Sequence, residues 1–345
     1  MATKFKSTKD ILVGVIGYGG AFNMGKTHLT SMKKAGMTPV AVTELDPARL
    51  QVAQDDFPGI EGYTSVSTML RKSGVNLVVL ITPHNTHAKL ALQCLRADRH
   101  VITEKPFAIT TAQCDTMIDE ARQRKLLLST YHNRHWDGCV LEALKRIHRQ
   151  KAIGDVHRIE AHMGGYGVPG DWWRSSKSIS GGILYDWGVH LLEYSLQIVN
   201  SEIVEVTGFS KSGFWAPKTV WKKDTNEDEA SAVVRFKSGA WINLTMSSIE
   251  SNPKEGWVEV TGTKGSYVFD SRTFKLIQRV DKERIVTEGQ NPGSQWQRFY
   301  NNIAAHLSKG SRLIITPEWA RRPIQIIDLA NQSAKKGCAI KAKYA

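Results

Sequence analysis

An acid and a histidine lie four residues apart in the segment "LYDWGVHLLEY", which runs from Leu184 to Tyr194. The segment is mostly apolar and predicts a buried helix, on which this spacing stacks Asp186 and His190 on one face. A carboxylate and an imidazole so placed either hold the core together through a hydrogen bond or act as a proton-handling pair. The spacing alone leaves both interpretations open.

A lysine ends the apolar run in "VITEKPFAIT". Pro106 favours an extended backbone at the residue before it, so Lys105 would project from the strand end in a fixed direction. A lysine in a partly desolvated cleft can donate or take a proton near neutral pH. The alternative is a simple ion pair between Glu104 and Lys105 at the edge of a loop.

A glycine cluster follows the first apolar run, "ILVGVIG". Gly17 and Gly19 fit the start of the phosphate-binding pattern G-x-G-x-x-G, but Phe22 occupies the third glycine position. Gly25 takes that role if the loop carries three extra residues, and the helix opening there would aim its N–H groups at a pyrophosphate. The predicted loop contacts to a dinucleotide are Gly17, Gly19, Gly20, Phe22, Asn23 and Met24.

Glu44 ends the next apolar run, "PVAVTE". In this position a carboxylate accepts hydrogen bonds from the adenosine ribose and repels a 2′-phosphate, which favours NAD over NADP. Arg49 lies about one helical turn further on and bears on the same choice. The alternative is an exposed glutamate at a strand end.

The elements that would position these residues alternate between strand and helix over residues 1–130. This alternation predicts βαβ units and a doubly wound parallel sheet, an α/β Rossmann domain. Ligands of such sheets bind beyond the carboxyl ends of the strands. The predicted strands are 11–17, 37–44, 75–83, 100–106 and 126–132. Outside the glycine loop, the candidate cofactor contacts at their ends are Glu44, Thr82, Pro83, Glu104 and Lys105.

The remaining residues, 131–345, alternate with period two around short turns, as in "ASAVVRFKSGAWINLTMS" and "VEVTGTKGSYVFD". Hairpins of this kind predict an α+β domain with a large, mainly antiparallel sheet. The helix with Asp186 and His190 would lie against that sheet. We expect the C-terminal helices to serve packing, and one of them can pack back on the first domain.

The loop "MGGYGVPGDWWRSSKSISGG" is unusually aromatic. The indole faces of Trp172 and Trp173 can stack on the C–H surface of a sugar, and Arg174 can hold a carboxylate or a phosphate. Equally, the tryptophans can simply fasten the loop to its domain.

Composition narrows the class of protein. The chain has 345 residues, a formal net charge of +13 and four cysteines without metal-ligand spacing, so no metal site is expected. The basic residues are scattered and form no nucleic-acid-binding motif. No apolar run approaches the ~20 residues of a membrane span, and the N-terminus does not resemble a signal peptide. A soluble, cytoplasmic protein is expected.

The order of these motifs resembles one family. A glycine loop, an acid-ended second strand, "TPHNTH", "EKP" and "DWGVH" after a glycine pair are similar to the Gfo/Idh/MocA oxidoreductases, relatives of glucose–fructose oxidoreductase and inositol 2-dehydrogenase. The resemblance covers nearly the whole chain and departs in the enlarged glycine loop. It implies catalytic roles for Lys105, Asp186 and His190. It extends the predicted cofactor contacts to His84, His87 and Asn133.

The resemblance also implies an activity: NAD-dependent hydride transfer to or from a secondary alcohol or hemiacetal carbon of a sugar, sugar derivative or cyclitol. In one assignment His190 would take the hydroxyl proton, Asp186 would orient the imidazole and Lys105 would hydrogen-bond the substrate oxygen. In the other assignment Lys105 is the base. The predicted substrate contacts are Lys105, Asn133, Arg134, Trp172, Trp173, Arg174, Asp186 and His190.

Three other functions stay open. They are an NAD-dependent glycosidase that oxidises the sugar ring transiently, a non-catalytic sugar or NAD sensor, and a nucleic-acid-binding protein suggested only by the net charge. Retention of the lysine, aspartate and histidine together disfavours the sensor, which needs no proton transfer. The resemblance further implies an open sheet face that forms subunit contacts, and hence a homodimer or homotetramer.

Overall fold

The computed structural model describes residues 5–344, and the chain divides into two compact units. The first unit comprises Met1–His132 and Gln297–Arg321, and the second comprises Asn133–Trp296 and Arg322–Ala345. Within residues 5–344, no helix combines the length and the apolar character that a membrane crossing requires.

The first unit contains a six-stranded parallel sheet in the order β3-β2-β1-β4-β5-β6. The inner strands β4 and β5 are buried at every residue, as expected for a sheet covered on both faces. The strands are β1 (Leu12–Ile16), β2 (Thr38–Thr43), β3 (Glu61–Tyr63), β4 (Leu77–Leu80), β5 (His100–Thr103) and β6 (Leu128–Thr130). The doubly wound α/β prediction is confirmed.

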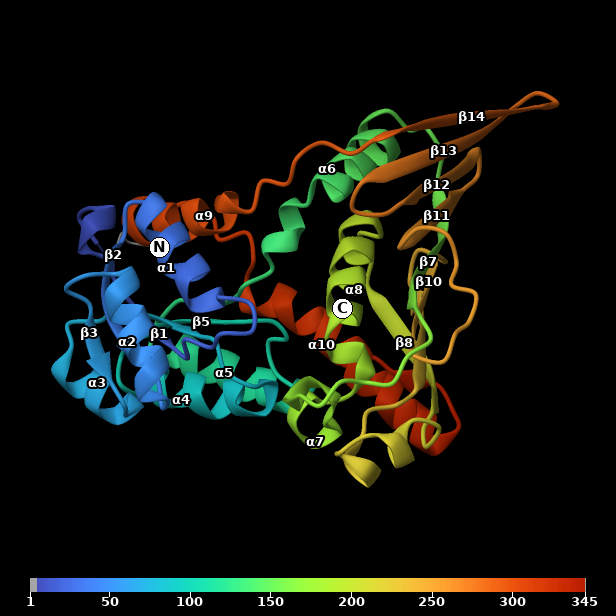
Figure 1. Ribbon diagram of the computed structural model, residues 1–345. Coiled ribbons are helices and arrows are strands. Elements are labelled where there is room, and N and C mark those ends of the chain that lie inside the picture. The colour runs from blue at the N-terminus through green and yellow to red at the C-terminus, as the bar shows by residue number, and fades with distance from the viewer. Residues whose placement is uncertain (1–4, 345) are drawn as a thin grey trace. The chain divides into compact units, whose positions relative to one another are not determined.

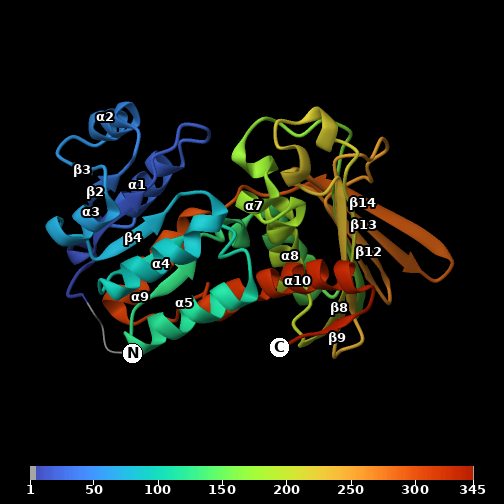
Figure 2. The same cartoon turned by 90° about the horizontal axis from the view of Figure 1, so that it is seen from below.

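Helices cover both faces of this sheet: α1 and α9 lie over one face, and α4 and α5 lie over the other (Figure 1). In Figure 2 the pair α4 and α5 stands in front of the sheet. The helices of this unit are α1 (Met24–Lys34), α2 (Pro47–Asp56), α3 (Val66–Lys72), α4 (His87–Arg96), α5 (Thr111–Gln123) and α9 (Gln297–Lys309). The short strand β3 and the helix α3 were not expected, because neither carries a marked apolar pattern.

The second unit contains a nine-stranded mixed sheet in the order β14-β13-β12-β11-β7-β10-β9-β8-β15. Among its described strands, β7 and β10 pair in parallel and the other neighbours are antiparallel, which confirms the mainly antiparallel prediction. The strands are β7 (Val156–Gly164), β8 (Ile203–Lys211), β9 (Glu229–Phe236), β10 (Trp241–Ser247), β11 (Val258–Gly262), β12 (Gly265–Phe269), β13 (Thr273–Val280), β14 (Glu283–Gln290) and β15 (Ile340–Lys341).

One face of this sheet packs on α8, which contacts β7 and β10, and on α6, which contacts β12. The side chains that meet these helices are apolar, among them Ile159, Ala161 and Leu244. The helices of the unit are α6 (Gly138–Leu144), α7 (Lys177–Ser180) and α8 (Trp187–Ile198), together with most of α10 (Pro317–Lys336), in which the division between the units falls.

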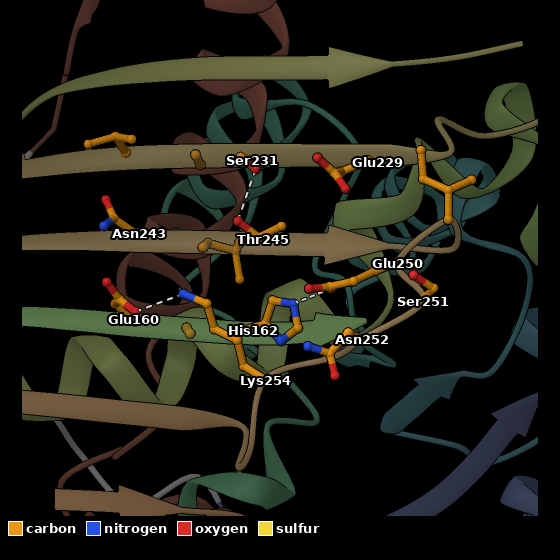
Figure 3. Close-up of a pocket in the computed structure, with 15 residues that line it drawn as sticks. Glu160, His162, Glu229, Ser231, Asn243, Thr245, Glu250, Ser251, Asn252 and Lys254 are labelled. Atoms are coloured by element: carbon orange, nitrogen blue, oxygen red, sulfur yellow. Dashed lines mark hydrogen bonds and ion pairs between the residues drawn. The ribbon is translucent and has the colours of Figure 1, made fainter. Parts of the chain in front are cut away.

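The opposite face is polar and bears an open depression of about 770 Å³ (Figure 3). Two ion pairs cross its floor, His162–Glu250 at 2.5 Å and Lys254–Glu160 at 2.9 Å. Because α8 lies on the covered face of the sheet, this depression is separate from the predicted catalytic pair Asp186 and His190.

Candidate active site

The carboxyl ends of the inner strands of the first unit are flush. Ile16 at the end of β1 pairs with Leu80, Leu80 pairs with Thr103, and Thr103 pairs with Thr130. The residues that follow these strands therefore begin at the same edge of the sheet. This edge carries the glycine loop, Thr82, Glu104 and Lys105, which is where ligands of doubly wound sheets bind.

The first glycine of the loop has a steric requirement. Gly17 has φ of +95°, and a Cβ placed on it would lie 2.3 Å from the carbonyl oxygen of Ile81. Gly25 allows a second close approach, since its Cβ would lie 2.4 Å from the ring of Tyr18. The Tyr18 hydroxyl donates to Asp56 at 2.8 Å, and Lys26 pairs with the same carboxylate. Tyr18 thus anchors the enlarged loop, a role that the sequence pattern did not reveal.

Between these two anchors the loop backbone suits a phosphate. For Cβ atoms placed on Gly19 and Gly20, the nearest atoms would be those of the Arg49 guanidinium, at 3.3 and 3.6 Å. The loop leads from Asn23 into the 11-residue helix α1. A helix N-terminus directs N–H groups and positive charge toward an anion. The residues present therefore fit the pyrophosphate of a dinucleotide.

Glu44, directly after β2, joins this loop to the second strand. Its carboxylate accepts the Tyr18 N–H at 2.6 Å and the N–H groups of Leu45 and Asp46 at 2.7 and 3.2 Å. Arg49 stands 3.4 Å from the Asp46 carboxylate. Two carboxylates and one guanidinium thus lie at the end of β2, with a net charge of −1.

The loop after β4 is tied to the EKP turn by a histidine. His87 is fully buried. Its ring nitrogens lie 2.9 Å from the carbonyl oxygen of Thr82 and 2.8 Å from that of Pro106. His84 is also buried and packs near His87. The Thr82 and Thr86 hydroxyls meet at 2.6 Å. His87 thus fixes the backbone on which Thr82 and Pro83 are presented.

A buried chain of side chains supports Lys105. The Glu104 carboxylate accepts a hydrogen bond from the Lys105 N–H at 2.9 Å and meets Nε2 of His28 at 2.9 Å. Because a carboxylate only accepts, Nε2 of His28 carries a proton toward it. Nδ1 of His28 meets the Tyr300 hydroxyl, on α9, at 2.5 Å. The chain therefore runs from α9 through α1 to the turn that presents Lys105.

This chain keeps Glu104 ionised. Burial alone would raise the pKa of the Glu104 carboxyl, but the hydrogen bond from His28 and the charges of His28 and Lys105 outweigh burial and hold that pKa below its usual value. Burial, with Tyr131 and Glu104 nearby, raises the pKa of the Tyr300 hydroxyl well above its usual value. A fixed negative charge therefore lies directly beside Lys105.

In the second unit, Asp186 does not lie within the helix as the apolar pattern of 184–194 had predicted. A 3₁₀ turn, Ile183–Tyr185, comes first, Asp186 is the N-cap, and α8 begins at Trp187. Gly181 and Gly182, both with positive φ, turn the chain into this position. Asp186 therefore lies at the entrance of α8, and His190, four residues later, lies in the second turn.

Arg174 pairs with this carboxylate: its Nη1 donates to Oδ1 of Asp186 at 2.5 Å. The Arg174 guanidinium also lies 5.3 Å from the ring of Trp172 and 5.1 Å from that of Trp173. His190 is buried, and its ring packs edge-on against Trp187 at 5.5 Å. The structure therefore brings Arg174 to Asp186 and packs Trp187 beside His190.

Arg134 contacts Trp187, the tryptophan that packs against His190. Its guanidinium lies 4.6 Å from the Trp187 ring and donates to Asp137 at 3.0 Å. Asp137 is buried and also accepts from the Tyr194 hydroxyl and the Trp296 indole, each at 2.5 Å. Asp137 and Trp187 were missed in the sequence, because an acid and an apolar residue without special spacing carry no signal. Asn133 begins the adjacent 3₁₀ turn.

Comparison with known proteins bears on both units. Residues 11–132 match the family described as "Oxidoreductase family, NAD-binding Rossmann fold". Residues 141–268 match the "GFO/IDH/MocA C-terminal domain". The protein is therefore an oxidoreductase with an NAD-binding Rossmann domain. It belongs to the Gfo/Idh/MocA family, and the resemblance drawn from its motifs is confirmed.

Named relatives cover most of the chain. The scyllo-inositol 2-dehydrogenase (NADP(+)) IolW of Bacillus subtilis is 26% identical over an alignment 364 residues long, which covers 96% of each chain. The myo-inositol 2-dehydrogenase of Thermotoga maritima is 27% identical over 273 residues, 79% of this chain and 78% of its own.

Solved structures show the same fold. Levoglucosan dehydrogenase in complex with NADH and levoglucosan has a TM-score of 0.82 at 20% identity, over 96% of this chain and 99% of its own. An NAD-binding protein from Listeria innocua has a TM-score of 0.80 at 24% identity, over 97% of both chains.

Proposed function

We propose that the protein is an NAD-dependent dehydrogenase of a sugar, sugar derivative or cyclitol, in which the bound nicotinamide exchanges a hydride with a secondary alcohol or hemiacetal carbon. The observation that carries this proposal is the flush edge of the first sheet, where the glycine loop and the supported Lys105 follow the ends of β1 and β5, the two strands that flank β4. The names of the inositol dehydrogenase relatives support a polyhydroxylated substrate.

The protein's own groups would handle the proton and orient the substrate. His190 would take the hydroxyl proton, with Asp186 supporting the imidazolium. Lys105 would donate a hydrogen bond to the substrate oxygen and stabilise its alkoxide character. The indoles of Trp172 and Trp173 would stack on C–H surfaces of the substrate. Asn133 and Arg134 are further proposed substrate contacts. For Arg174, contact with an acidic group of the substrate is the alternative to its pairing with Asp186.

We propose NAD as the preferred cofactor, with Glu44 at the adenosine ribose. The net charge of −1 at the end of β2, from Glu44, Asp46 and Arg49, opposes a 2′-phosphate. Arg49 beside the glycine loop acts in the other direction, so NADP would be used less efficiently and not refused. One relative is named as NADP-dependent, so the preference has to be measured on this chain.

The proposal is tested by incubating the protein with NAD or NADP and a panel that includes myo-inositol, scyllo-inositol and levoglucosan. Formation of reduced nicotinamide is followed by absorbance, and the organic products are identified. Stoichiometric NADH with a keto product supports a dehydrogenase. Cleavage of a glycoside without net NADH would instead indicate the glycosidase cycle, in which the cofactor is regenerated.

We also propose that the polar face with the His162–Glu250 and Lys254–Glu160 pairs joins copies of the chain into a homodimer or homotetramer. Thr245 points outward from the middle of this face (Figure 3). Thr245→Arg should shift the sedimentation coefficient toward the monomer, whereas Lys33→Glu on the exposed surface of α1 should not. An unchanged oligomer in Thr245→Arg would place the contact elsewhere.

A further inference from the structure

The loop before α8 is held by side-chain hydrogen bonds from Asp224 and Asn226. Asn226 donates from Nδ2 to the Arg174 carbonyl at 2.7 Å, and its N–H donates to the Ser175 carbonyl at 3.0 Å. The Asp224 carboxylate accepts from the Ser176 hydroxyl and from the N–H and hydroxyl of Ser178. The backbone of Arg174 is therefore fixed from the opposing segment.

The Arg174 side chain is equally constrained. It is 19% exposed and stacks near two indoles, at distances where cation–π attraction is effective. A planar guanidinium held in this way loses little additional freedom when it pairs with a carboxylate. Its bond to Oδ1 of Asp186 is accordingly built by the loop and does not arise from chance contact of two flexible side chains.

Asp186 occupies a position with a competing use. An aspartate at a helix N-cap normally accepts the N–H of the second or third helical residue. Asp186 forms no such capping bond, although it is the N-cap of α8. Its carboxylate is directed to Arg174 instead. The pair therefore diverts the carboxylate from its ordinary structural role, four residues before His190.

We propose that Arg174 is a positioning residue, which holds the Asp186 carboxylate away from the α8 cap and in the orientation that supports His190. This inference rests on the proposed function, because it assumes that Asp186 and His190 act in proton transfer. It differs from the prediction that Arg174 binds an anionic substrate, since the anion here is part of the protein.

Without Arg174, the carboxylate can rotate to cap α8, so the helix keeps its stability while the orientation is lost. Arg174→Gln should therefore lower kcat about tenfold or more, with KM for the polyol and Kd for NADH within about twofold and an unchanged Tm. Arg174→Lys, which keeps a charged donor, should recover much of the rate. Arg284→Gln, an exposed arginine on β14, is the matched control and should change nothing.

A double-mutant cycle tests this inference. Its kcat values are measured with NAD and myo-inositol, or with the panel member that is turned over fastest. In the Asp186→Asn background Arg174 has no carboxylate to position, so adding Arg174→Gln should change kcat less than about twofold. If the losses of kcat in Arg174→Gln and in Asp186→Asn multiply in the double variant, the inference is overturned and the proposed function stays intact. A rise in KM confined to acidic substrates would also overturn it, in favour of substrate binding.

The two levels of failure are separable. If Asp186→Asn turns over at the wild-type rate, the proposed role of Asp186 is wrong and the inference fails with it. If Asp186→Asn is impaired but Arg174→Gln is fully active, only the inference fails. Should Arg174→Gln not fold, Arg174→Met in the same cycle carries the test, because it keeps an aliphatic stem against the two indoles and removes the charge that pairs with Asp186.

Discussion

The first unit supports Lys105 from regular structure, whereas the second unit supports Asp186 from loops. Behind Lys105, Glu104, His28 and Tyr300 are placed by the end of β5, by α1 and by α9. Around Asp186, Arg174 is placed by a loop that side-chain hydrogen bonds hold. Support from regular elements is coupled to the stability of the whole unit. Support from a loop can be altered at little cost in stability.

The largest effects test whether both sites belong to catalysis at all. Lys105→Ala and His190→Ala should each lower kcat by about two or more powers of ten, because a group that handles the substrate proton or its developing charge is lost. Binding of NADH, followed by fluorescence titration, should be nearly unchanged. Lys89→Ala, an exposed lysine on α4, serves as the control. Full rates in both variants would refute the assigned roles.

The next effect concerns stability in the first unit. Glu104→Gln keeps the shape but removes the charge that meets His28, and should lower the free energy of unfolding at pH 7 by about 1–3 kcal/mol. The pKa of Glu104 is held below its unfolded value of about 4.3, so this contribution is present above that pH and is lost as the pH falls through the folded-state pKa.

Urea denaturation of the wild type and Glu104→Gln at pH 7 and at lower pH measures this difference, which should shrink toward acid. Glu255→Gln is the control, since Glu255 is 80% exposed in its pair with Lys275 and such pairs contribute little. A difference between wild type and Glu104→Gln that does not depend on pH would mean that packing, and not charge, explains the effect.

A smaller effect concerns the choice of cofactor at the end of β2. Glu44→Gln removes one negative charge, and should raise the ratio of kcat/KM for NADP to that for NAD about tenfold, equal to about 1.4 kcal/mol. Arg49→Ala should move the ratio in the opposite direction. Steady-state kinetics with both cofactors measures it. No change in either variant would show that the end of β2 does not face the 2′ position.

The difference between the units also explains what could be predicted from the sequence. The sheet of the first unit and the positions of Glu44 and Lys105 follow from apolar runs and a proline, which are local signals. The link from His28 to Tyr300 joins residues 272 positions apart, which no local pattern connects. A signal was present, since His28 lies on the buried face of α1 with Leu29 and Met32. A buried polar group there requires a partner.

In the second unit, the apolar character of 184–194 predicted α8 but not its start. Asp186 lies outside the helix because Gly181 and Gly182 introduce a turn that periodicity does not register. Arg174 was recognised as able to hold a carboxylate, but the carboxylate is that of Asp186, 12 residues on. Pairing between loop side chains depends on backbone angles and side-chain hydrogen bonds, so no periodic sequence pattern reveals it.

The smallest effects compare the two kinds of support directly. Tyr300→Phe removes one buried hydrogen bond to His28 and should lower the stability of the first unit by about 1 kcal/mol, with little change in kcat.

Asp224→Asn weakens the loop that holds Arg174. It should raise amide hydrogen exchange in residues 171–183 about tenfold and lower kcat severalfold, without changing the exchange of the core strands. Hydrogen exchange measured by mass spectrometry gives the stability of the first unit and the exchange of the loop and of the core strands, and steady-state kinetics gives kcat for both variants. If Asp224→Asn destabilised the core strands as much as the loop, support from loops and support from regular structure would not differ in this protein.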